Sequence, residues 1–174
     1  KIVSNELTPR GIPLIGFSGA PFTLASYAIE GGGSKTYSKM KTLLYNDPEG
    51  WDTLMRKLVT VQADYLKQQV VYGASALQVF DSWAGLALGY LDYIRYVQPY
   101  NTMLFEELKE TAVPVINFSA GTGLYLDEVA KCGGDVIGVD WRIPIDMAWE
   151  KVGHDRAVQG NLDPLILSST PEIV

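Results

Sequence analysis

Short apolar runs alternate with longer amphipathic stretches along this chain, and that alternation limits the fold more than any other feature. The apolar runs occupy residues 12–17, 76–80, 113–118, 136–139 and 157–159. They contain few polar residues, which is typical of strands that are buried on both faces. Repeated strand–helix units predict a parallel sheet with right-handed crossovers, either open and doubly wound or closed into a (β/α)8 barrel.

Three of the intervening helices have recognisable boundaries. The clearest begins at Asp47-Pro48, where an Asp N-cap precedes Pro in the first turn, and it ends before Gly73. A second covers about residues 124–132, and a third follows Pro144. No linker, repeat or low-complexity tract interrupts the pattern, so we expect one domain.

The number of units is smaller than a closed barrel requires. A (β/α)8 barrel usually needs about 250 residues and eight units, whereas 174 residues supply about five. The chain begins at Lys1 rather than Met, and the helix-start pattern Thr170-Pro171-Glu172 comes just before its end. We therefore expect residues 1–174 to form a partial domain, truncated at both ends.

Composition argues against several classes of function. A net charge of −6, from 14 basic and 20 acidic residues, is not that of a nucleic-acid-binding protein. No apolar run approaches the roughly 18 residues of a membrane span. The single cysteine, Cys132, allows no internal disulfide and fits a reducing, cytoplasmic setting. Zinc sites need three or four ligands, and His154 is expected to be a surface residue near a helix end.

Candidate functional residues follow the predicted strands. In parallel α/β folds the site lies beyond the carboxyl ends of the strands, and every strand here ends in a small, polar or aromatic cluster. Five such loops together favour one shared site. Ser82 has no G-x-S-x-G context and no neighbouring histidine, so it is predicted to bind substrate rather than to act as a nucleophile.

Three aspartates and one glycine-rich loop each admit two interpretations. Asp81 and Asp140 are candidates for acid–base chemistry, or for capping helices and bracing loops. Asp163 is expected to be a cap. The Gly-rich residues 31–33 lack the spacing of a phosphate-binding P-loop and are expected to form a lid or a tight turn.

Taken together, the strand-end segments resemble the uroporphyrinogen decarboxylase family. The resembling segments are Pro13–Leu24, Tyr27 with Glu30–Lys35, Phe80–Gly85, Gly138–Trp141 and Gln159–Pro164. They are similar to the third, fourth, sixth and seventh strands of the family's barrel with their loops, and they occur in family order. The resemblance covers nearly the whole chain and implies a (β/α)8 TIM barrel, of which the third to seventh strand–helix units are present.

The resemblance also implies an activity. Family members are carboxy-lyases of haem and porphyrin biosynthesis, expected to be cytoplasmic homodimers that use no metal and no organic cofactor. They remove the carboxyl groups of the four acetate side chains of uroporphyrinogen III, which gives coproporphyrinogen III. A protonated pyrrole can accept the electrons of the leaving carboxylate. The protein must therefore hold the pyrrole N–H groups, stabilise the cation and place acidic groups.

Family roles carry over only onto residues that this chain contains. Tyr27 matches a tyrosine that lies over the substrate, and its ring is expected to rest on apolar neighbours such as Phe17. Ser82 matches a hydroxyl residue that contacts the substrate, and Phe17 and Phe80 are expected to wall the cleft. The family's catalytic arginines and its N–H-binding aspartate would precede the first residue, and its substrate-binding histidine would follow the last. No catalytic residue is therefore expected here, and the isolated chain is predicted to be inactive.

Two alternatives stay open. Related cobamide-dependent methyltransferases share the barrel but use a zinc site with a His-x-Cys pair, which this sequence lacks. The chain is alternatively a truncated, non-catalytic paralogue that acts as a binding subunit. An intact mass of the purified protein separates a natural short chain from a longer one.

Overall fold

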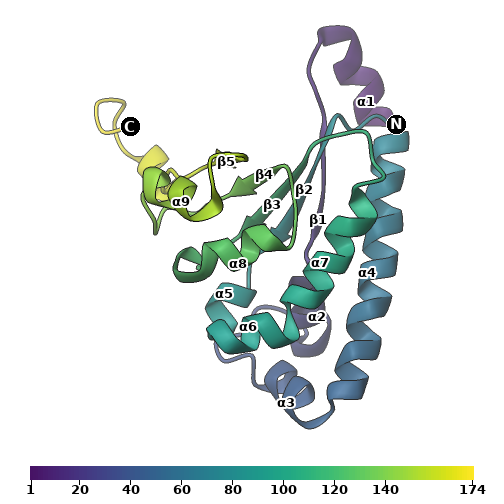
Figure 1. The fold of residues 1–174 in the computed structure, drawn as a ribbon. Coiled ribbons are helices and arrows are strands. Elements are labelled where there is room, and N and C mark those ends of the chain that lie inside the picture. The colour runs from purple at the N-terminus through teal and green to yellow at the C-terminus, as the bar shows by residue number, and fades with distance from the viewer.

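A parallel sheet of five strands forms the centre of the computed structural model, which describes all residues 1–174. The strands are β1 (Ile15–Gly19), β2 (Ala76–Asp81), β3 (Val115–Ser119), β4 (Val136–Gly138) and β5 (Ala157–Gln159). They lie side by side in chain order, and every neighbouring pair is parallel (Figure 1). A doubly wound sheet would instead reverse its strand order at a switch point. The order therefore matches the wall of a barrel.

Helices connect the strands and gather on one side of the sheet (Figure 1). The α-helices are α1 (Ile2–Leu7), α2 (Pro21–Glu30), α3 (Ser38–Asn46), α4 (Pro48–Val71), α5 (Ala84–Ala87), α6 (Tyr90–Tyr96), α7 (Gln98–Leu108), α8 (Leu126–Lys131) and α9 (Ile145–Val152). Three 3-10 helices are η1 (Thr8–Arg10), η2 (Gly123–Tyr125) and η3 (Pro164–Ser168). None of the helices is both long enough and apolar enough to span a membrane.

The two faces of the sheet have different surroundings. Successive side chains of a strand point to opposite faces, and in β2 Leu77, Val79 and Asp81 are buried toward the helices. On the other face Phe17 is 61 % exposed. There the ring of Phe80 meets Phe17 edge-on at 6.0 Å and Phe118 at 5.7 Å. We call these three rings the phenylalanine row. It lies on the face that would become the inside of a closed barrel.

The longest helix confirms the boundary that the sequence predicts. The Asp47 side chain accepts a hydrogen bond from Gly50 N at 2.9 Å and so caps the start of α4. One face of α4 is buried, and on it the indole N–H of Trp51 donates to the carbonyl of Tyr96 at 3.1 Å. That bond ties α4 to α6. The buried side chains of α4 and α7 fill the space between these helices and the sheet.

Some predicted boundaries are wrong. The first and third strands begin at Ile15 and Val115, two or three residues late, because Pro13 and Pro114 precede them and a proline offers no N–H to a strand ladder. The helix-start pattern at Thr170 does form a first turn within the chain, in which Ile173 N and Val174 N donate to Thr170 O at 3.0 and 3.4 Å. One turn is too short to be a stable helix.

Candidate functional site at the carboxyl ends of the strands

The loops after β1 and β2 bring Tyr27 and Ser82 to one region of the structure. Tyr27 lies in α2, which follows β1, and Ser82 comes directly after β2. The ring of Trp83 packs edge-on against Tyr27, with centroids 5.8 Å apart, and against the ring of Tyr37 at 6.1 Å. Because Trp83 is the neighbour of Ser82 in the chain, this aromatic contact holds Tyr27 next to the Ser82 segment.

Both hydroxyls are available to a ligand. Tyr27 is 44 % exposed and its hydroxyl makes no hydrogen bond within the chain. Ser82 uses its backbone N–H, which donates to Thr23 Oγ1 at 3.0 Å, and leaves its own Oγ without a partner. Tyr27 does not rest on Phe17, which packs against Phe80 instead. That detail of the sequence prediction is therefore wrong.

Asp81 braces the site from behind the sheet. Its carboxyl group is only 1 % exposed and faces the helices. Oδ1 accepts from the Thr23 hydroxyl at 3.0 Å and from Ala84 N at 3.2 Å, and Oδ2 accepts from Asn101 Nδ2 at 3.3 Å. Burial raises the pKa of Asp81, and these hydrogen bonds partly offset that rise. With its oxygens engaged by three donors, Asp81 fits the bracing interpretation better than acid–base chemistry.

Asp140 joins the loops after β3 and β4 in a similar way. Its Oδ2 accepts from Gly121 N at 2.8 Å and from Arg142 Nη1 at 2.6 Å, while Oδ1 accepts from the backbone N–H of Arg142 at 3.0 Å. The guanidinium group of Arg142 lies 4.1 Å from the centre of the Trp141 ring, a cation–π contact. This arrangement favours bracing for Asp140. It also places a cation, which the sequence reasoning overlooked, beyond a strand end.

The remaining candidates have structural roles. The Asp163 side chain accepts from Leu165 N at 2.9 Å and caps η3, as predicted. Gly31 closes α2 in the left-handed conformation, at φ 79°, so the glycine-rich residues begin with a tight turn. His154 is exposed, with its ring against Trp149 at 5.1 Å. No cluster of three or more His, Cys, Asp or Glu side chains forms that could hold a metal ion.

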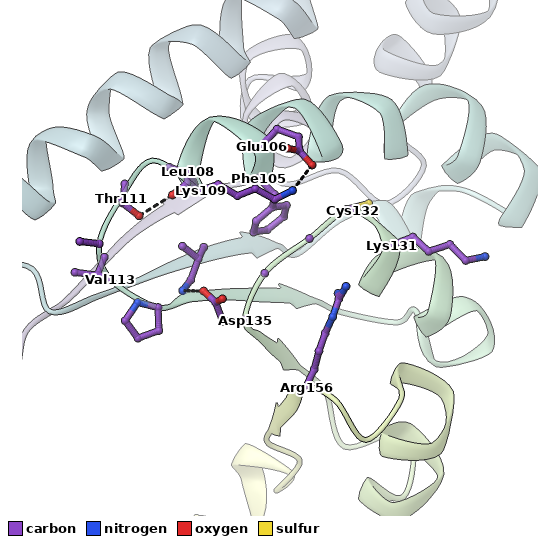
Figure 2. Close-up of a pocket in the computed structure, with 15 residues that line it drawn as sticks. Phe105, Glu106, Leu108, Lys109, Thr111, Val113, Lys131, Cys132, Asp135 and Arg156 are labelled. Carbon is purple, nitrogen blue, oxygen red and sulfur yellow. Dashed lines mark hydrogen bonds and ion pairs between the residues drawn. The ribbon is translucent and has the colours of Figure 1, made fainter.

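The largest cavity lies at the opposite end of the strands. It measures about 580 Å³ and is lined by residues that precede β3, β4 and β5, among them Val113, Asp135 and Arg156 (Figure 2). There Asp135 accepts from Val115 N at 2.8 Å, and the Arg156 guanidinium donates to the carbonyl of Ala130. Since function in parallel barrels lies beyond the carboxyl ends of the strands, size alone does not make this cavity the site.

Comparison with protein-family models matches residues 1–174 to the model described as "Uroporphyrinogen decarboxylase (URO-D)". The uroporphyrinogen decarboxylase of Carboxydothermus hydrogenoformans is 53% identical over 174 residues, which are 100% of this chain and 49% of that protein. That of Sorangium cellulosum is 51% identical over 96% of this chain and 47% of its own length. The chain thus spans about half the length of the curated relatives it matches.

Among solved structures, a methyltransferase from Methanosarcina mazei superposes with a TM-score of 0.75. The match covers 87% of this chain and 43% of that chain, at 14% sequence identity. At that identity the likeness concerns the fold alone. It supports the barrel wall and does not favour the methyltransferase alternative.

Proposed function

Since the chain belongs to the uroporphyrinogen decarboxylase family, we propose that it is part of an enzyme that converts uroporphyrinogen III to coproporphyrinogen III. The observation that carries this proposal is the 53% identity to a curated decarboxylase over all 174 residues. In each of four steps a C–C bond to an acetate carboxyl group breaks and CO₂ leaves. The electron pair passes into the pyrrole, which is protonated at a ring carbon. A proton then adds to the exocyclic carbon and completes the methyl group, and the ring carbon releases its own proton, which restores the pyrrole.

Residues 1–174 contribute five wall strands of a TIM barrel and part of its substrate site. The free hydroxyls of Tyr27 and Ser82 are the groups that contact the tetrapyrrole. Phe17 and Phe80 supply an apolar wall, and Phe118 extends it as the third ring of the phenylalanine row. An apolar wall keeps water away, which strengthens electrostatic interactions with the pyrrole cation.

The complete enzyme works without a metal or an organic cofactor, as a cytoplasmic homodimer. The family resemblance supports these features. The chemistry needs no external electron sink, because the protonated pyrrole accepts the electrons of the leaving carboxylate. Turnover should therefore continue in the presence of EDTA, after the enzyme has been stripped of metals and desalted. Loss of turnover that Zn²⁺ restores would contradict this part of the proposal.

The direct test uses the full-length protein that contains this chain. Uroporphyrinogen III is supplied under anaerobic, reducing conditions, and the products are oxidised to porphyrins and separated by their number of carboxyl groups. We expect species with seven, six, five and then four carboxyl groups to appear in turn. If the protein binds uroporphyrinogen but removes no carboxyl group, it is instead the non-catalytic binding subunit.

A further inference from the structure

We propose that the buried hydroxyl of Thr23 positions the two substrate contacts, Tyr27 and Ser82, relative to each other. The inference rests on the proposed function, which makes Tyr27 and Ser82 substrate contacts. Thr23 itself is only 4 % exposed and does not reach the substrate. It acts through Ser82, so it is a positioning residue.

The Thr23 hydroxyl makes two hydrogen bonds of opposite sense. It accepts from the backbone N–H of Ser82 at 3.0 Å, and it donates to Asp81 Oδ1 at 3.0 Å. A hydroxyl has one proton, and here the Thr23 hydroxyl donates it in the hydrogen bond to the Asp81 carboxylate. The lone pairs of the hydroxyl oxygen are therefore left to accept from the Ser82 N–H. The direction of each bond is therefore fixed, and one buried atom holds the backbone of Ser82 in place.

The position of Thr23 on its helix connects this bond to Tyr27. Residues 23 and 27 are four apart in α2, so their side chains lie on the same face, one turn from each other. The Thr23–Ser82 bond thus joins α2, one turn before Tyr27, to the first residue beyond β2. The Trp83 ring against Tyr27 forms a second connection between the same two segments. Together the two contacts fix the distance between the hydroxyl groups of Tyr27 and Ser82.

Asp81 anchors the arrangement to the rest of the protein. It accepts from Asn101 in α7 and from the backbone of Ala84 at the start of α5. If the Thr23 hydroxyl is removed, Asp81 loses one of its donors and the Ser82 N–H loses its acceptor. Buried groups without partners force local rearrangement, and the segment free to move here is the one that carries Ser82.

The test compares three variants of the full-length enzyme. Thr23→Val removes the hydroxyl and keeps the shape, and Thr23→Ser restores the hydroxyl. Ser26→Ala is the matched control, because Ser26 lies in the same helix, is 2 % exposed, and donates only to Phe22 O at 2.8 Å. We expect Thr23→Val to lower kcat/KM roughly ten- to a hundredfold through misplacement of Ser82. Thr23→Ser should recover most of that loss, and Ser26→Ala should leave the kinetics unchanged.

Amide hydrogen exchange at Ser82, measured without substrate, gives a readout that does not depend on activity. Thr23→Val should speed this exchange, whereas Thr23→Ser and Ser26→Ala should not. Unchanged exchange at Ser82 in Thr23→Val would overturn the positioning role whatever the kinetics. If exchange speeds up but Ser82→Ala and Tyr27→Phe keep wild-type kinetics, the positioning contact stands and the proposed substrate site fails.

Discussion

The side chain of Gln69 pairs with the backbone of Phe17 as a neighbouring strand would. Gln69 Oε1 accepts from Phe17 N at 2.9 Å, and Gln69 Nε2 donates to Phe17 O at 3.0 Å. β1 has a strand neighbour on one side only. A residue of α4 therefore satisfies backbone groups at the free edge of the sheet, next to a predicted wall of the substrate site.

This pairing predicts different effects of Gln69→Met in two settings. In the 174-residue chain, Gln69→Met should lower the free energy of unfolding by roughly 0.5–1.5 kcal/mol for each lost hydrogen bond. In a longer polypeptide whose preceding strand pairs with β1, the same change should have little effect. Urea denaturation of both proteins measures the difference. Equal losses of unfolding free energy in the two proteins would show that no strand replaces Gln69 as the hydrogen-bonding partner of Phe17.

The isolated chain should not decarboxylate uroporphyrinogen. It spans about half the length of its relatives, and both edges of its sheet lack a strand partner. From the family resemblance, the catalytic arginines and the N–H-binding aspartate are expected to match no residue of this chain. The assay is loss of carboxyl groups over many hours, with a full-length relative as the positive control. Turnover near that of the control would mean that the essential residues lie within these 174.

Tyr27→Phe and Ser82→Ala should each weaken catalysis in the full-length enzyme without unfolding it. Losing a hydrogen bond to a charged group costs about 1.5–3 kcal/mol, or roughly ten- to a hundredfold in kcat/KM. Neither hydroxyl has a partner within the chain, so Tm should change little. Tyr45→Phe is the control, because Tyr45 is an exposed residue of α3 whose hydroxyl already donates to Asp92 at 2.6 Å and is therefore not free for a ligand. Wild-type kinetics in both test variants would remove these residues from the site.

Asp140→Ala should destabilise the protein more than Arg142→Ala does. Removing Asp140 leaves Gly121 N and the N–H of Arg142, both in partly buried hydrogen bonds, without their acceptor, at a cost of roughly 0.5–1.5 kcal/mol for each lost bond. Removing the Arg142 side chain leaves Asp140 with both backbone donors. Chemical denaturation of the two variants in the full-length enzyme gives the comparison, and a larger loss for Arg142→Ala would contradict it.

The thiol of Cys132 should be unreactive in the native protein. Burial raises its pKa to about 11, so very little thiolate exists at pH 8. Alkylation at pH 8, followed by peptide mass spectrometry, should label Cys132 only after denaturation. The unfolded thiol ionises near pH 8.5, so between there and pH 11 the folded state holds more protons. Stability should fall as pH rises through this range, and Cys132→Ala should lessen that slope.

The sequence predicted the parallel sheet because its strands read as continuous apolar runs, although in the structure one face of β1 is largely exposed and β5 has no buried residue. The start of α4 was predictable because Asp47 and Pro48 act locally, within the first turn. The helices between residues 84 and 108 were not identified, because three short helices follow one another there without the long apolar periodicity that marks a single helix.

The candidate site was only partly predictable. The family resemblance supplied Tyr27 and Ser82, but the ring that holds Tyr27 turned out to be Trp83 rather than Phe17. The bond from Thr23 to Asp81 joins residues 58 apart in the chain. Such contacts depend on how loops fold over the strand ends, and residue spacing carries no signal for them.

The two edges of the sheet have different practical consequences for anyone who purifies the isolated chain. Gln69 covers the backbone of Phe17 at the β1 edge, whereas β5 presents a three-residue edge with no strand beside it. An uncovered edge is a template for pairing with another molecule. Aggregation during concentration and storage should therefore begin at β5. A lysine at the exposed Ala157 would be a better solubilising change than any substitution along β1.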